Sequence, residues 1–262
     1  MPAPLWLEWS AAVIVPVTSR TCRARGSRTK IAAYFAVVVS FWCTAAHAAG
    51  EVGATISIFS DARFRGYSLS QGQPVGIFDF AYDDPSGFYA DASGTGVLQH
   101  NGHPAPLGLQ LNTGYAKRLR SGTTLDFGVT RSTYSRYSRA EAATSYTEVY
   151  AGISRGGLSS RIFLSPHYSE ADLWTAYWEV NGTFSPAPKW SLDGHVGMLV
   201  PLKTPPGNER YRTAFDLRVG VSRELGPISL HLAWDQGEHG RAYYGDRAGR
   251  GRAIVAGASW AL

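Results

Sequence analysis

Charged and imidazole side chains recur on alternate positions of this chain, with apolar residues between them. Asp126 lies between Leu125 and Phe127, and Glu179 lies between Trp178 and Val180. In a water-filled passage, acidic groups favour cations and arginines favour anions. The same groups could instead pair internally and plug a narrow barrel, and the sequence leaves both readings open. The pattern predicts these pore-lining or constriction residues: Arg63, Arg65, Asp91, Asp126, Glu148, Arg161, Glu179, Asp193, His195, Asp216, Arg218 and His231.

Catalytic chemistry is the competing interpretation of some of these groups. The string "GISRG" at 152–156 matches G-x-S-x-G, but a nucleophile elbow needs its serine on a turn from strand to helix. Ser154 instead ends one expected strand and leads to another. His195 and His231 could serve a lipid hydrolase only with a serine in hydrogen-bond reach, and no spacing ties one to them. We expect no catalytic residue, no metal and no cofactor.

The elements that position these groups are expected to be strands. Segments of about ten residues alternate strictly, as where Leu107, Leu109 and Leu111 share one face and Gly108 and Gln110 the other. Successive side chains of a strand point to opposite faces, so this period indicates strands. Tight Gly- and Pro-rich turns alternate with longer polar connections. The sequence therefore predicts an all-β, up-and-down meander of about twelve strands.

Composition favours a membrane barrel over a soluble sandwich. Charged residues are only 17% and aromatic residues 13% of the chain, whereas soluble domains have about a quarter charged residues. Transmembrane strands run about 9–11 residues and alternate apolar-out with polar-in. A sheet in lipid must also close. The aromatic residues expected in the interfacial girdles are Tyr82, Phe88, Tyr134, Tyr146, Tyr168, Trp174, Trp190, Tyr211, Trp234 and Trp260.

Residues 1–48 are expected to be an N-terminal extension plus a signal peptide, followed by the barrel at 49–262. A basic stretch at 19–30, an apolar run at 31–43 and small residues at 46–50 form the pattern of a secretory signal, with cleavage after Ala48. The apolar run is shorter than a membrane-spanning helix requires. Removing the leader leaves 20 basic and 19 acidic side chains and no cysteine, so the chain gives no argument for nucleic acid.

The stretch "SDARFRGYSLSQGQP" at 60–74 places Asp61, Arg63 and Arg65 on alternate positions. They share the parity of Ser57, so we expect them to extend the lumen face of the first strand into the mouth. Gly66 permits a bend that would fold Arg65 over the opening.

The same stretch resembles the TorF family, whose members are assigned as porins. The matching residues are Ser60, Asp61, Phe64, Arg65 and Gly66, followed by Gly72 and Pro74. The segments 86–90 and 146–154 are also similar to family segments, whereas Ala62 stands where an aromatic residue is frequent. The resemblance implies an outer-membrane barrel of porin type and names no solute.

These observations predict a bacterial outer-membrane channel for passive diffusion of small hydrophilic solutes or ions. The alternatives are an outer-membrane lipid hydrolase and a closed structural or adhesion barrel. The expected partners are outer-membrane lipid, lipopolysaccharide and small hydrophilic solutes, and the oligomeric state is left open. The arginines of the last long loop that could meet lipopolysaccharide phosphates are Arg241, Arg247, Arg250 and Arg252.

Overall fold

A computed structural model describes residues 50–135, 144–207, 210–244 and 251–262, and they form a closed β-barrel. The expected leader at 1–48, both cysteines, Arg247 and Arg250 lie outside these residues. The barrel strands are β1 (Glu51–Phe59), β4 (Val75–Asp83), β5 (Phe88–Leu98), β6 (Pro104–Arg118), β7 (Thr124–Tyr134), β8 (Thr144–Arg155), β9 (Leu158–Ser165), β10 (Trp174–Ala187), β11 (Trp190–Lys203), β12 (Ala214–Leu225), β13 (Ile228–Glu238) and β14 (Arg252–Ala261). Two short strands, β2 (Arg63–Phe64) and β3 (Tyr67–Ser68), and one helix, α1 (Arg241–Tyr244), complete the described elements.

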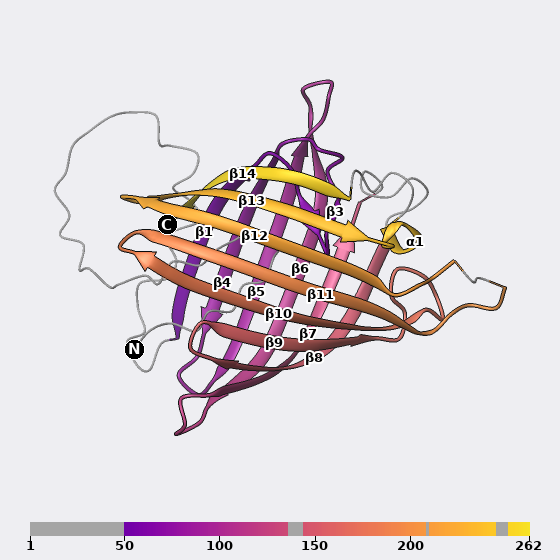
Figure 1. Ribbon diagram of the computed structural model, residues 1–262, viewed down its shortest axis with the longest axis horizontal. Helices are drawn as coiled ribbons and strands as arrows, with labels where there is room; N and C mark the ends of the chain where they lie inside the picture. Colours follow the sequence, from indigo (N-terminus) through magenta and orange to yellow (C-terminus); the bar gives the residue numbers. More distant parts are fainter. Residues whose placement is uncertain (1–49, 136–143, 208–209, 245–250) are drawn as a thin grey trace, which may run out of the picture.

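The strands follow one another around the barrel in chain order. Each pairs antiparallel with its neighbours in sequence, and β1 closes the ring by pairing with both β4 and β14. Figure 1 shows the tight turns and the C-terminus at one end and α1 at the other. The predicted all-β, antiparallel, up-and-down barrel of twelve strands is confirmed.

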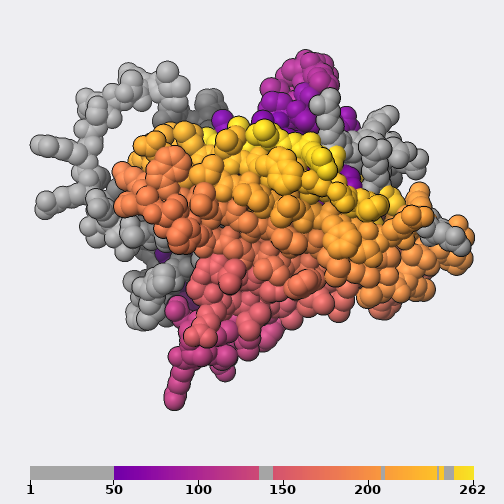
Figure 2. Space-filling view, in the orientation of Figure 1, coloured from indigo at the N-terminus to yellow at the C-terminus, as the bar shows by residue number. Residues whose placement is uncertain are grey.

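The outer wall is apolar and the inner wall is polar, as the alternation predicts. Leu111 is 47% exposed and Phe127 is 50% exposed, whereas Asp126, directly before Phe127, is fully buried. An apolar band of this kind suits a lipid environment. Figure 2 shows consecutive strands forming one continuous surface on the side in view.

No helix in the described part of the chain is long and apolar enough to cross a membrane.

One residue predicted to face lipid faces the lumen instead. Leu107 was expected beside Leu109 and Leu111, yet it is fully buried. The pairing of β5 with β6 shifts register between Thr95 and Gly96, so that β6 carries one extra residue there. Because side chains alternate with period two, a bulge of one residue turns the following positions to the other face.

Part of the predicted aromatic girdle is also wrong. Phe88, Trp174, Trp190, Trp234 and Trp260 are exposed on the outer wall, and Tyr82 is at 37% exposure. The four remaining girdle candidates near the outer end are buried and pack among other rings inside the barrel mouth. They are Tyr134, Tyr146, Tyr168 and Tyr211.

The first strand does not extend into the mouth as expected. β1 ends at Phe59, and the chain then turns inward, where β2 and β3 pair with each other as a small hairpin. We call residues 60–74 the inner hairpin. The tip residues Arg65 and Gly66 both have positive φ, 45° and 78°, which is the backbone of a type I′ turn. Gly66 does permit the bend, but by reversing the chain inside the barrel.

Candidate functional site

Asp61 holds the inner hairpin together from its base. Its Oδ1 accepts hydrogen bonds from the hydroxyls of Ser68 at 2.5 Å and Ser70 at 2.7 Å, and from the Gly72 N–H at 3.2 Å. Three donors on one carboxylate oxygen fix both arms of the hairpin around a single buried group. The aspartate of the Ser-Asp motif therefore organises the hairpin and does not line a passage.

Arg63 and Gly66 fix the hairpin against the barrel wall. The Arg63 guanidinium donates to the Gly66 carbonyl at 2.5 Å and to the Asp235 carboxylate of β13 at 3.2 Å. Gly66 itself lies against the β13 backbone, because a Cβ built on it would come within 2.5 Å of the Gly237 Cα and 2.7 Å of the Gln236 carbonyl oxygen. Only glycine fits this contact.

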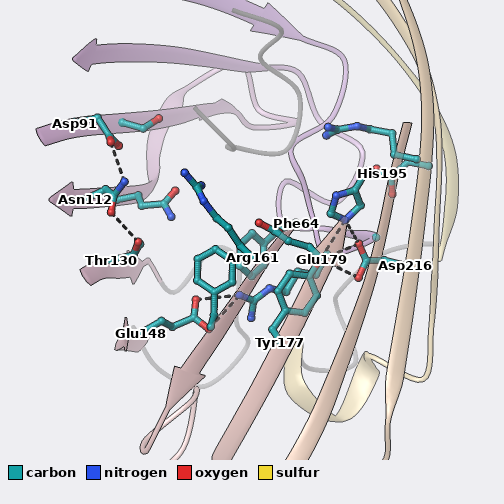
Figure 3. A pocket seen from close by; sticks show the side chains of 17 residues that line it. Phe64, Asp91, Asn112, Thr130, Glu148, Arg161, Tyr177, Glu179, His195 and Asp216 are labelled. Atoms are coloured by element: carbon teal, nitrogen blue, oxygen red, sulfur yellow. Dashed lines mark hydrogen bonds and ion pairs between the residues drawn. The ribbon is translucent and has the colours of Figure 1, made fainter. Parts of the chain in front are cut away.

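Arg65 lies at the tip of the hairpin and crosses to the opposite wall. Its Nη2 donates to both Glu148 carboxylate oxygens at 3.0 and 2.9 Å, and its Nη1 donates to the Tyr168 hydroxyl at 2.8 Å. The guanidinium carbon lies 3.8 Å from the ring centre of Tyr177 and 5.8 Å from that of Phe163. Figure 3 shows Glu148, Tyr177 and Phe64 grouped on this side of the lumen.

Burial keeps the hydroxyl of Tyr168 protonated. Tyr168, in the connection between β9 and β10, is fully buried, and this burial raises the pKa of its hydroxyl above the ordinary value. The hydroxyl therefore stays neutral, accepts from Arg65 and contacts the Tyr244 hydroxyl at 2.9 Å.

A second set of ion pairs runs along the inner wall, between strands that are adjacent or two apart. Arg161 of β9 donates to the Asp126 carboxylate of β7 at 2.9 Å. The Nε2 of His195 lies 2.7 Å from the Asp216 carboxylate. On the same two strands, β11 and β12, the Arg218 guanidinium and the Asp193 carboxylate lie 3.6 Å apart. Tyr177 contacts both sets, since its ring lies against the Arg65 guanidinium and its hydroxyl contacts both His195 and Asp216.

The wall formed by β4 to β7 carries acidic groups that meet neutral donors. The Asn112 amide donates to Asp91 at 2.9 Å and accepts from the Thr130 hydroxyl at 3.1 Å, a chain visible in Figure 3. The Ser93 hydroxyl donates to the buried Asp79 carboxylate at 2.5 Å. Asp79 and Asp91 are therefore held by neutral hydroxyl and amide donors.

All twelve residues predicted to line the pore lie on the inner side of the barrel. They are buried or half-buried, and most of them meet in ion pairs or line one cavity. That central cavity measures about 70 Å³, enough for a few water molecules. The inward side chains of the described residues include nine carboxylates and four guanidinium groups. These are Asp61, Asp79, Asp91, Asp126, Glu148, Glu179, Asp193, Asp216 and Asp235, with Arg63, Arg65, Arg161 and Arg218.

Sequence reasoning missed the rings that surround Arg65. Tyr177 shares the inward parity of Glu179, on whose face the alternation already places it, and Phe163 shares the parity of Arg161. Parity could not have shown that they meet Arg65, because the inner hairpin was expected to be part of a strand. Only the tertiary path of residues 60–74 brings these side chains together.

The structure also places the residues that were considered for catalysis or metal binding. Ser154 lies within β8, in a strand that turns directly into β9, so the G-x-S-x-G match has no elbow. A serine–histidine contact that the sequence did not reveal joins the Ser259 hydroxyl to His231 Nε2 at 3.0 Å. Among the described residues, no three His, Cys, Asp or Glu side chains gather as a metal site requires.

The barrel is similar to solved outer-membrane proteins. The NanC porin matches with a TM-score of 0.53 at 10% identity, over 81% of this chain and all of that chain. The KdgM porin has a TM-score of 0.46 at 8% identity, over 80% and 98% of the two chains. LpxR from Salmonella typhimurium has a TM-score of 0.44 at 7% identity, over 80% and 99%. At these identities the likeness concerns the fold alone.

No curated protein sequence matches this chain significantly. None of the comparisons names the TorF family, so that resemblance stays an expectation. A family model matches residues 44–260, which is most of the chain, and its description is "Bacterial protein of unknown function (Gcw_chp)". The chain therefore belongs to the Gcw_chp family.

Proposed function

We propose that this protein is an outer-membrane channel for small hydrophilic solutes, that it prefers cations, and that the inner hairpin sets its opening. The observation that carries the proposal is the charge of the inner wall. Among the described residues, at least nine inward carboxylates accompany four guanidinium groups inside a closed barrel with an apolar outer wall, and the inner hairpin supplies one of these carboxylates and two of the guanidinium groups. Acidic linings favour cations, and a low-dielectric wall focuses the field along the lumen.

The location follows from the same walls. A barrel with an apolar outer band needs lipid around it, and the expected signal peptide would deliver the chain across the inner membrane. The similarity to outer-membrane porins supports an outer-membrane location. Solutes would then enter at the end that carries α1 and the long connections and leave at the end of the tight turns.

A closed structural barrel is the second candidate, and a specific observation favours it. The central cavity holds only about 70 Å³, and the hairpin is tied across it by the pairs Arg65–Glu148 and Arg63–Asp235. A channel therefore requires the inner hairpin to leave this position for part of the time. A closed barrel requires that it never does.

The hydrolase alternative receives less support. The Ser259–His231 contact has the reach that nucleophile activation needs. In catalytic triads, however, a third group orients the imidazole through its Nδ1. His231 Nδ1 is buried without a hydrogen-bond partner among the described residues. The contact is better read as part of the polar packing that also joins Ser57 to Ser259 at 2.9 Å.

Single-channel recording of the purified protein in a planar bilayer tests the proposal. We expect discrete conductance steps and a reversal potential of cation preference in a potassium chloride gradient. A variant in which residues 62–72 are replaced by a short Gly-Ser turn should conduct more. Silence of both proteins would establish the closed barrel, and anion preference in both would refute the charge argument.

A further inference from the structure

The group around Arg65 has the composition of a binding site for an organic cation. We propose that Glu148, Phe163, Tyr168 and Tyr177 form a cage for solutes that carry a guanidinium or alkylammonium group, and that Arg65 is its tethered occupant. This inference deepens the proposed function by naming the solute class. It rests on the channel only for the route by which the solute arrives.

The cage belongs to the barrel wall and its occupant belongs to the hairpin. Glu148 lies on β8, Phe163 on β9, Tyr177 on β10, and Tyr168 in the connection between β9 and β10. Arg65 comes from the tip of the inner hairpin, 83 residues before Glu148. Wall and occupant can therefore separate without breaking any strand pairing of the barrel.

The contacts satisfy the chemistry of a planar organic cation. Tyr177 stacks at 3.8 Å from the guanidinium carbon, and the rings of Tyr168 and Phe163 lie at 5.2 and 5.8 Å. All three distances fall within the range of cation–π attraction. Glu148 supplies the counter-charge with both oxygens, and the Tyr168 hydroxyl accepts from the second nitrogen. Guanidinium is weakly hydrated and stacks on rings, so it suits this cage better than a sodium ion.

The burial of the pair shows how closely the cage encloses its occupant. Arg65 is 8% exposed and Glu148 is 3% exposed. A buried carboxylate that loses its cation is strongly destabilised. When Arg65 leaves, the cage is therefore left with a buried charge and three open rings, and a soluble cation of similar shape relieves both.

The occupant is held less firmly than a wall residue would be. β2 and β3 pair with each other and not with the barrel. Arg65 itself has a φ of 45°, a left-handed conformation that L-residues other than glycine, asparagine and aspartate disfavour. A free cation in the cage would carry no such strain. The structure therefore supports exchange between Arg65 and a solute.

Thermal unfolding of the full-length protein in detergent micelles tests the cage without any need for conduction. Arg65→Ala should unfold at a lower temperature than the wild type, and millimolar methylguanidinium chloride should restore part of the loss in a saturable way. At ten times its dissociation constant, a bound ligand raises the folding constant about elevenfold. Sodium chloride of equal ionic strength should not restore the unfolding temperature of Arg65→Ala. In the wild type Arg65 already fills the cage, so the two salts should give the same unfolding temperature.

The matched control is the double variant Arg65→Ala with Glu148→Gln, which should lose the methylguanidinium response. Equal responses of Arg65→Ala to the two salts would overturn the proposal. If Arg65→Ala does not fold alone, refolding in methylguanidinium must recover the heat-modifiable folded band, and failure to recover it would also overturn the proposal. A methylguanidinium response in a protein that never conducts would keep the cage and refute only the channel.

Discussion

Replacing Gly66 by alanine should displace the inner hairpin from its contact with β13. We call the hairpin seated when it makes this contact and unseated when it does not. The glycine has a φ of 78°, and a Cβ there would lie 2.5 Å from the Gly237 Cα and 2.7 Å from the Gln236 carbonyl oxygen. Both atoms belong to the backbone of β13, which is paired on both sides in the barrel. The wall cannot move aside, so the hairpin must.

The size of the effect follows from two terms. A left-handed φ costs an L-residue about 1–2 kcal/mol. Overpacking against a rigid neighbour adds about 1–3 kcal/mol. Together they raise the ratio of unseated to seated hairpin by about thirtyfold or more, since 1.4 kcal/mol is a factor of ten.

Gly72→Ala is the matched control. Gly72 lies in the same hairpin with a φ of 76°, yet a Cβ there would meet nothing within 4 Å. This variant has the backbone term without the clash. The free energy of docking the hairpin on β13 should therefore differ by about 1–3 kcal/mol between the two variants. The ratio of unseated to seated hairpin should differ roughly 5- to 150-fold.

Two assays read the unseated population. Trypsin cleaves after arginine, and Arg63 and Arg65 are buried in the seated hairpin, so cleavage in proteoliposomes should track the open form. Open-state probability in bilayers gives the second measure. Gly66→Ala should be cleaved faster and conduct more than Gly72→Ala. Equal trypsin resistance and equal conductance in the two variants would refute the docking of Gly66 on β13.

The strands could be predicted from the sequence because their cause is local. Alternation in each segment is visible without knowing its neighbours, and lipid on one side with water or packed charges on the other makes the pattern strict. The inward position of Asp126, Glu148 and Glu179 follows from the same parity. These predictions needed no knowledge of which strands meet across the lumen.

The inner hairpin could not be predicted because its cause is tertiary. Alternate placement of Asp61, Arg63 and Arg65 is typical of a strand, and nothing local shows that the chain reverses at a non-glycine residue with positive φ. Arg65 has a φ of 45°, and its side chain contacts Glu148 and Tyr177, which come from strands far along the chain. The inward turn of Leu107 likewise depends on a bulge between two paired strands. Parity fails where a register shift intervenes.

Three further results are expected. Arg161→Ala leaves the fully buried Asp126 carboxylate without its bonded guanidinium, and the free energy of unfolding in urea should fall by about 3–5 kcal/mol. Adding Asp126→Asn should recover part of this loss, and no recovery would mean that the broken pair does not cause it. Leu107→Ala should cost about 2–5 kcal/mol as a core truncation, more than Leu109→Ala on the lipid face, and the reverse order would contradict the bulge. The purified wild type and Ser259→Ala should not differ in ester hydrolysis. Hydrolysis by the wild type that is lost in Ser259→Ala would support the hydrolase.

Opening and ion preference should be coupled, because the inner hairpin carries two of the four buried or half-buried arginines that the described residues place in the lumen. Arg63 and Arg65 leave with it and so does Asp61, so the lumen loses two positive groups and one negative group and becomes more negative by one charge. The more excess negative charge that lines the passage, the more strongly it favours cations. The Gly66→Ala channel should therefore have a reversal potential shifted further toward cation preference than the wild type in the same salt gradient. A variant that conducts more with an unchanged reversal potential would mean that the hairpin arginines do not contribute to the field the ions meet.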